Sequence, residues 1–339
     1  MEESKDKENN NQTIDNRVRK RYQQLIEEGS LEIGVCPFID PNVPPEWFDE
    51  SKFKRAQKTA DKYLIRLQLL LTNNSLKWAS FSGLILGIQI PLFLEPLLTN
   101  GNHDSVSKLF KRYLDTDMKV SSWYENDPFD ESGEAYKSLR KVRAMHKSIF
   151  KTMNNLTSRS IGSQRLWVSQ CQMVLTQAGF FGLLITHTSS CFAHGISDSE
   201  LEDIIYLWRV LGYLNGIQDK YNLCTYDNLE DTRAYLLYIA DQFLTPQVSL
   251  TPHHPYPIGF QVAEGVAQAF RPVVRIRWQV FIAYWYNILG LSFTSAFKLS
   301  WFHWTLLQFT KFVFNWVLRF RFVYNLVNDM SKKRVKWGR

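Results

Sequence analysis

Residues 139–155, LRKVRAMHKSIFKTMNN, contain the pattern that decides the fold. Their apolar positions recur three, four and seven residues apart, so they fall on one face of an α-helix. These positions are Leu139, Val142, Ile149, Phe150 and Met153. His146 lies on the same face. The pattern therefore predicts an amphipathic helix with a histidine inside its apolar stripe.

Helical signals recur along the rest of the chain. Ser197 and Glu200 form a capping box before a helix that Gly216 can end. Another helix is expected to start at Asp227 and to stop before Pro246. No run of alternating apolar and polar residues occurs, and the 339 residues include only 16 Gly and 12 Pro. We predict an all-α fold.

Residues 166–186 carry no formal charge and are long enough to span a bilayer. They contain several polar side chains, which are costly in lipid: Ser169, Gln170, Gln172, Thr176 and Gln177. A helix buried in the protein, with its amides turned to a cavity, is therefore the better prediction. Gly179 and Gly182 would let a bulky group approach its backbone. A second apolar stretch, residues 79–94, is short and contains Pro91.

The positive charge is concentrated at the C-terminal end. The formal net charge is +7, and residues 271–339 hold 12 Lys and Arg against one acid, Asp329. These cations alternate with Phe, Trp and Leu, which favours an anionic membrane surface over nucleic acid as the partner. Residues 278–297 are uncharged. Their composition is compatible with a helix that spans a bilayer and with one that lies in its interface.

The chain divides into four predicted segments. Residues 1–16 are charged and polar, which predicts a disordered tail without a cleavable signal peptide. Residues 17–246 form the helical domain and residues 247–259 a proline-rich break. Residues 260–339 are amphipathic and hydrophobic helices with a basic tail. The four cysteines lack paired spacing, so neither a zinc finger nor a disulfide framework is indicated.

His146 is the first candidate for chemistry. A single histidine on an apolar helix face is most often a core residue. Here Arg143 and Arg140 precede it by three and six residues. A neutral imidazole can bind haem iron while guanidinium groups pair with the haem propionates. The alternative is a helix with a solvated basic face.

Other residues offer weaker candidate sites. Arg112 and Thr116 share a helical face and could hydrogen-bond dioxygen or a propionate, although a helix cap or surface contact explains them as well. Glu95 would be a base if it were buried, and an ordinary carboxylate at a helix end in water. A non-haem site of two histidines and one carboxylate would use His187 and His194, which are seven residues apart; His253 and His254 lie in the proline-rich break.

Four segments between about Ser80 and Pro246 carry a family resemblance. They are RYLDT at residues 112–116, VRAMH ending at His146, WVSQCQMVLTQAGFFG, and WRVLGYLNGIQDKYNLC at residues 208–224. Their order resembles the latex-clearing-protein (rubber oxygenase) and mpaB-type oxygenase family. The resemblance implies a distantly globin-like helical domain that binds haem b through one histidine. It implies that His146 is the proximal iron ligand, that Arg112 and Thr116 line the pocket, and that Glu95 lies near the family's proposed base.

One position departs from the family pattern. Rubber-cleaving members have a lysine before the threonine, where this chain has Asp115. The endoplasmic-reticulum-bound branch, which cleaves an isoprenoid side chain on a small molecule, is therefore the closer analogy. The sequence favours a haem-b oxygenase on an intracellular membrane, the endoplasmic reticulum, that uses dioxygen and a lipophilic substrate such as an isoprenoid-containing molecule. The alternatives are a non-catalytic helical lipid-binding or membrane-adaptor protein, and a non-haem metalloenzyme.

Overall fold

The computed structural model describes residues 2–63, 75–99, 105–157, 165–226, 228–249, 257–274, 276–291 and 298–320. Within these ranges the regular elements are helices and no strand is present, which confirms the prediction of an all-α fold. An isolated antiparallel bridge joins Ile33 to Ser169.

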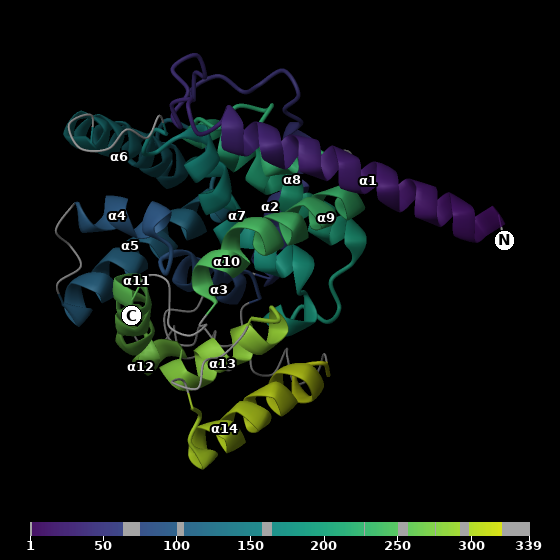
Figure 1. The fold of residues 1–339 in the computed structure, drawn as a ribbon. Coiled ribbons are helices and arrows are strands. Elements are labelled where there is room, and N and C mark those ends of the chain that lie inside the picture. The colour runs from purple at the N-terminus through teal and green to yellow at the C-terminus, as the bar shows by residue number, and fades with distance from the viewer. Residues whose placement is uncertain are drawn as a thin grey trace.

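The helices follow one another along the chain as shown in Figure 1. They are α1 (Glu2–Glu27), α2 (Glu50–Tyr63), α3 (Ser75–Gly87), α4 (Pro91–Leu98), α5 (Val106–Glu125), α6 (Glu134–Thr157), α7 (Gln170–Thr186), α8 (Asp198–Asn215), α9 (Leu229–Ile239), α10 (Thr245–Val248), α11 (Pro257–Ala269), α12 (Arg271–Val274), α13 (Trp278–Ile288) and α14 (Trp301–Phe312). Short 3-10 segments, η2 (Ser189–Cys191) and η3 (Leu223–Thr225), and π segments, η4 (Ala240–Leu244) and η5 (Val313–Val317), connect some of them.

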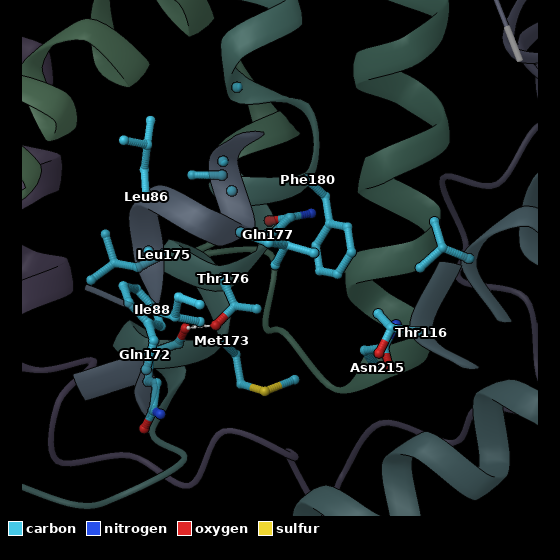
Figure 2. Close-up of a pocket in the computed structure, with 18 of the residues that line it drawn as sticks. Leu86, Ile88, Thr116, Gln172, Met173, Leu175, Thr176, Gln177, Phe180 and Asn215 are labelled. Carbon is cyan, nitrogen blue, oxygen red and sulfur yellow. Dashed lines mark hydrogen bonds between the residues drawn. The ribbon is translucent and has the colours of Figure 1, made fainter. Parts of the chain in front are cut away.

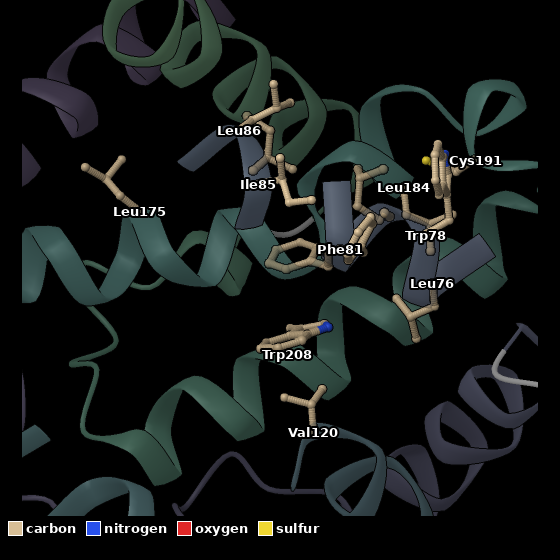
Figure 3. Packing of buried hydrophobic residues seen from close by; sticks show 14 of the residues in the cluster. Leu76, Trp78, Phe81, Ile85, Leu86, Val120, Leu175, Leu184, Cys191 and Trp208 are labelled. Carbon is tan, nitrogen blue, oxygen red and sulfur yellow. The ribbon is translucent and has the colours of Figure 1, made fainter. Parts of the chain in front are cut away.

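Helix α7 is the central helix, and α3, α8 and α9 pack against it (Figure 1). One side of α7 faces a cavity, drawn in Figure 2, and the other joins the buried core, drawn in Figure 3. Gly83 on α3 lies so close to α7 that a Cβ atom there would overlap the carbonyl oxygen of Gly179. Because α7 is surrounded by protein, its lack of charge marks burial rather than a bilayer span, as predicted.

Aromatic side chains hold α3 to the C-terminal helices. The ring of Trp78 stacks on that of Trp285, with centroids 6.1 Å apart, and makes edge contacts with Phe281 and Phe314. Figure 3 shows Trp78 and Phe81 on α3 in the same packed region as Leu184 and Cys191. Each buried aromatic side chain removes a large apolar area from water. The C-terminal helices are therefore part of one core with α3 and α7.

Several helix boundaries follow their sequence signals. Ser197 caps α8 through a complete capping box with Glu200, and Gly216 ends that helix in a left-handed conformation, with φ of 103°. Helix α9 begins after an N-cap at Asn228, and Asp227, the predicted start, lies outside the described residues. Helix α6 buries Leu139, Val142, Ile149 and Met153, as the apolar period predicted.

The N-terminal segment differs from its prediction. Where a disordered tail was expected over residues 1–16, α1 runs from Glu2. Ile14, Val18 and Leu25 lie on one side of this helix and are buried, because α1 packs against α9. The expectation rested on the polar composition of the first residues, in which the apolar stripe begins only at Ile14.

The described part of residues 278–297, which were expected at a membrane contact, belongs to the core. Trp278, Tyr284 and Trp285 are buried on α13, and the Tyr286 hydroxyl donates to the Val248 carbonyl over 2.6 Å. Residues 292–297 lie outside the described part of the chain. In the ranges that the structure covers, no single helix has the length and apolar composition to cross a membrane. Helices α3 and α4 reach that length and apolar composition only when they are taken together, and the chain bends by 88° at the break between them.

Candidate functional site

A cavity of about 930 Å³ lies between α3, α5, α6, α7 and α8, with α4, α9 and η4 closing its other sides. Ligand pockets in proteins typically measure about 300 to 1,000 Å³, so this one can hold a large organic molecule. Side chains from Gln172 to His187 line it, and a helix rises about 1.5 Å per residue, so the cavity extends roughly 20 Å along α7. Most of its lining is apolar.

The α6 side of the cavity carries His146. Val142, Met145 and Ile149 line the wall beside it, because the apolar stripe of α6 turns toward the centre of the domain. The Nδ1 atom of His146 is buried and has no hydrogen-bond partner among the described residues. Burial lowers the pKa of this histidine to about 4. The imidazole is therefore neutral near pH 7, which is the form that can bind a metal.

The α5 side brings Arg112 and Thr116 to the same cavity, as predicted. Thr116 Oγ1 donates to the Arg112 carbonyl oxygen over 3.2 Å. The Arg112 guanidinium is half-buried, and among the described residues it has no hydrogen-bond or ion-pair partner; burial lowers its pKa. Figure 2 shows Thr116 across the cavity from the α7 residues Thr176 and Gln172.

Further charged residues of α5 line the cavity. They are Lys108, Lys111, Asp115 and Lys119. Lys119 forms an ion pair with Asp115 one turn earlier on the helix. The acid at position 115 is thus partly neutralised, and the α5 wall as a whole presents positive charge. Such a wall suits an anionic group on a bound molecule.

The structure does not bring Arg143 and Arg140 to the cavity. Arg143 is 5% exposed and donates to the carbonyl oxygens of Cys36, Ile39 and Leu214 over 2.8, 2.6 and 3.2 Å. Arg140 donates to the Pro41 carbonyl over 2.6 Å. Both side chains reach toward the segment after α1, which covers this edge of α6. The hydrogen bonds of the two arginines hold that segment against α6. The geometry does not support their predicted role in binding haem propionates.

Glu95 is not among the residues that line the cavity, although Phe93, Pro96 and Leu97 of the same helix are. Its carboxylate is half-buried on α4. The role of a base, which the family resemblance implied, therefore has no geometric support here.

The two histidines of the alternative non-haem site have different surroundings. His187 lines the cavity at the end of α7, and burial lowers its pKa. Thr186 Oγ1 donates to the Gly182 carbonyl, so it accepts a hydrogen bond from His187 Nδ1 over 2.7 Å. His194 Nε2 lies 2.7 Å from the Phe314 carbonyl. No group of three His, Cys, Asp or Glu side chains suited to a metal occurs in the described ranges, and His253 and His254 lie outside them.

The prediction that the amides of α7 turn to a cavity is confirmed for two of the three glutamines. Gln172 and Gln177 line the cavity, whereas Gln170 donates to the carbonyls of Ile33, Gly34 and Gly216, each over 2.9 Å. Gly179 and Gly182 both line the cavity.

Sequence reasoning missed two cavity residues on α8. Within the described ranges the Asn215 Oδ1 and Trp208 Nε1 atoms are buried without a hydrogen-bond partner, as is Gln177 Oε1 on α7. Figure 2 shows Gln177 and Asn215 at the cavity. An unpaired buried polar atom is costly unless a ligand or water satisfies it. The signal that could have found Asn215 is its place at the end of α8, beside the Gly216 turn.

The site is thus a large, mostly apolar cavity in a helical domain, with a neutral histidine and a basic wall. The family model described as "ER-bound oxygenase mpaB/B'/Rubber oxygenase, catalytic domain" matches residues 73–318. The chain belongs to this family and carries an oxygenase catalytic domain. The matched region extends past Pro246 and includes α14. This agrees with the fold, in which the C-terminal helices share one core with α3 and α7. No curated protein and no solved structure matches the chain.

Proposed function

We propose that this protein is a haem-b-dependent oxygenase that acts with dioxygen on a lipophilic substrate. The observation that carries the proposal is the position of His146, a histidine whose pKa burial lowers to about 4, on the wall of a cavity of about 930 Å³. A neutral imidazole nitrogen is a common ligand of haem iron, and the cavity has the volume for a porphyrin together with a substrate. The residues present therefore fit this cofactor.

The chain's own residues take distinct roles in this proposal. His146 holds the iron through its neutral imidazole. Arg112 pairs with an anionic propionate, because it lines the cavity and has no carboxylate partner in the part of the chain that the structure describes. Thr116 contributes a hydroxyl oxygen on the same wall. Bound haem would supply the redox chemistry that activates dioxygen.

The rest of the cavity supports a lipophilic substrate. Its apolar lining excludes water and favours binding of a hydrocarbon chain, such as an isoprenoid side chain. Its length along α7 suits such a chain in an extended form. Gln177 and Asn215 also line the cavity and bring polar side chains to it.

The family description names oxygenases bound to the endoplasmic reticulum. We place this protein at the same intracellular membrane as part of the proposal. Separation of a cell lysate into soluble and membrane fractions tests that placement, and a fully soluble pool would contradict it.

An absorption spectrum of the purified protein tests the cofactor. We expect a Soret band in the wild-type protein and in His187→Asn, which changes another histidine of the same cavity, and its loss in His146→Ala. Iron content and circular dichroism are measured on the same samples. Colourless protein with bound iron would favour a non-haem enzyme, and colourless folded protein without metal would favour a lipid-binding adaptor; both contradict the proposal.

A further inference from the structure

The segment from Trp301 to Phe320 has two apolar faces. One face packs onto the protein through the buried side chains of Leu307, Phe314 and Leu318. The opposite face exposes seven large aromatic side chains, which we call the α14 aromatic face: Trp301, Phe302, Trp304, Phe309, Phe312, Trp316 and Phe320. A surface helix normally turns polar residues to water. The outer side of this segment therefore lacks the composition of a solvated surface.

The aromatic side chains are well exposed. Trp301 is 81% exposed, and Phe309 and Trp316 are each 61% exposed. In Figure 1, α14 lies at the edge of the molecule, with α13 on one side of it. A contiguous exposed apolar surface marks a contact with another protein or with a membrane.

The charges around this face favour an anionic partner. The sequence holds no Asp or Glu between Arg271 and Phe320. Lys298 and Arg319 are exposed, Lys311 is half-buried on α14, and the Arg277 guanidinium lies 5.2 Å from the ring centre of Phe302. Each such cation near an anionic lipid surface contributes about 1 kcal/mol to binding. A second copy of this chain would instead bring the same cations against each other.

The geometry also determines how this segment would meet a bilayer. In the described ranges no single helix, α14 included, has the length and apolar composition to cross a membrane. The inner face of this segment is fixed, because the Phe314 ring lies 4.3 Å from that of Phe192 and His194 Nε2 bonds to the Phe314 carbonyl. The segment can therefore lie in the interface but cannot turn to cross the membrane without leaving the core.

We propose that the α14 aromatic face docks this protein on an anionic lipid surface, with α14 lying in the plane of the interface. Tryptophan and phenylalanine enter the boundary between headgroups and acyl chains, and the flanking cations pair with the headgroups. The proposal deepens the membrane attachment proposed above by naming its surface and lipid charge. It does not depend on the cofactor, so loss of haem and loss of lipid binding are separate outcomes.

Co-sedimentation of the full-length protein with lipid vesicles tests the proposal. Wild type is compared on phosphatidylcholine vesicles and on vesicles with one quarter phosphatidylserine. We expect binding to the anionic vesicles that weakens with added salt, and at least a tenfold loss of binding in Phe309→Glu/Trp316→Glu. A charge-matched control, Gln23→Glu/Thr152→Glu, changes two exposed side chains elsewhere and should bind as wild type does. Equal binding to both vesicles, or equal binding by both double variants, would overturn the proposal.

Two further measurements cover the remaining outcomes. If the charged variant does not fold by circular dichroism, the uncharged pair Phe309→Ser/Trp316→Ser replaces it with the same expectation. Alkaline carbonate should release the bound protein from the anionic vesicles, and resistance to carbonate would contradict the interfacial position. Light scattering gives the oligomeric state, and a dimer that Phe309→Glu/Trp316→Glu disrupts, without vesicle binding by wild type, would assign the face to a second copy.

Discussion

Gly83 on α3 and Gly179 on α7 touch backbone to backbone, and their contact is asymmetric. A Cβ atom on Gly83 would overlap the carbonyl oxygen of Gly179, whereas a Cβ atom on Gly179 would lie 3.7 Å from the carbonyl oxygen of Gly83, an ordinary contact distance. Both glycines also line the cavity. The closest approach of the two helices thus helps to set the shape of the proposed binding site.

This asymmetry predicts opposite effects of the same substitution. Gly83→Ala should push α3 away from α7 and lower the free energy of unfolding by about 1 to 3 kcal/mol, as overpacking does. Gly179→Ala should be neutral or stabilising, because alanine favours a helix by about 1 kcal/mol over glycine. Urea unfolding followed by circular dichroism measures both. Equal stability of the two variants would show that α3 and α7 lie farther apart.

Arg143 gives a second prediction. Arg143→Met removes the donors for three carbonyl oxygens, and each buried acceptor left unpaired costs about 1 to 3 kcal/mol. We expect a loss of about 3 kcal/mol or more, and a smaller loss in Arg140→Met. The Soret absorbance per folded molecule should stay unchanged in both. A variant of normal stability with weaker haem binding would instead restore the role of Arg143 at the propionates.

The buried histidine His187 gives a pH prediction. Burial lowers its pKa below the ordinary 6.5. As the pH falls through 6.5, the unfolded chain binds a proton at this position before the folded protein does, so the free energy of unfolding decreases; above 6.5 the group contributes no pH dependence. His187→Asn retains a donor for Thr186 Oγ1 but does not titrate. It should lose less stability than wild type between about pH 7.5 and 5.5 in urea unfolding. An identical pH dependence would contradict burial of His187.

The cysteines give a fourth prediction. Cys36, Cys171, Cys191 and Cys224 are all buried and free. Burial raises the pKa of Cys171 to about 11 and also raises those of Cys191 and Cys224. Because the thiolate is the reactive form, iodoacetamide should leave the folded protein unlabelled at about pH 8 and label four thiols after unfolding. Mass spectrometry counts the labels, and a modified cysteine in the folded protein would identify an exposed one.

Local patterns predicted the fold well. The apolar period of α6, the capping box of α8 and the polar residues inside an uncharged α7 each indicated the helix that the structure contains. Composition misled at the N-terminal end, where it predicted a disordered tail. The aromatic composition of α13 also suits a membrane contact. Packing against Trp78, which is far away in sequence, is what places these residues in the core. The globin-like arrangement that the resemblance implied stays a prediction.

The candidate site was predictable where side chains point along a known helix face. His146 and Arg112 reach the cavity from the helices in which their spacing placed them. Arg143 could not be placed from sequence, because the Cys36 and Ile39 carbonyls that it binds come from an irregular segment after α1. Asn215 and Trp208 became candidates only when the structure showed their unpaired polar atoms.

The partners of Trp78 also set the order in which this protein can finish folding. Phe281, Trp285 and Phe314 leave the ribosome long after α3 does. Until those aromatic residues are made, the tryptophan surface of α3 stays open to water and to other nascent chains. Synthesis that stops before α13 leaves a fragment with an incomplete core, which is a substrate for chaperones rather than a smaller working enzyme.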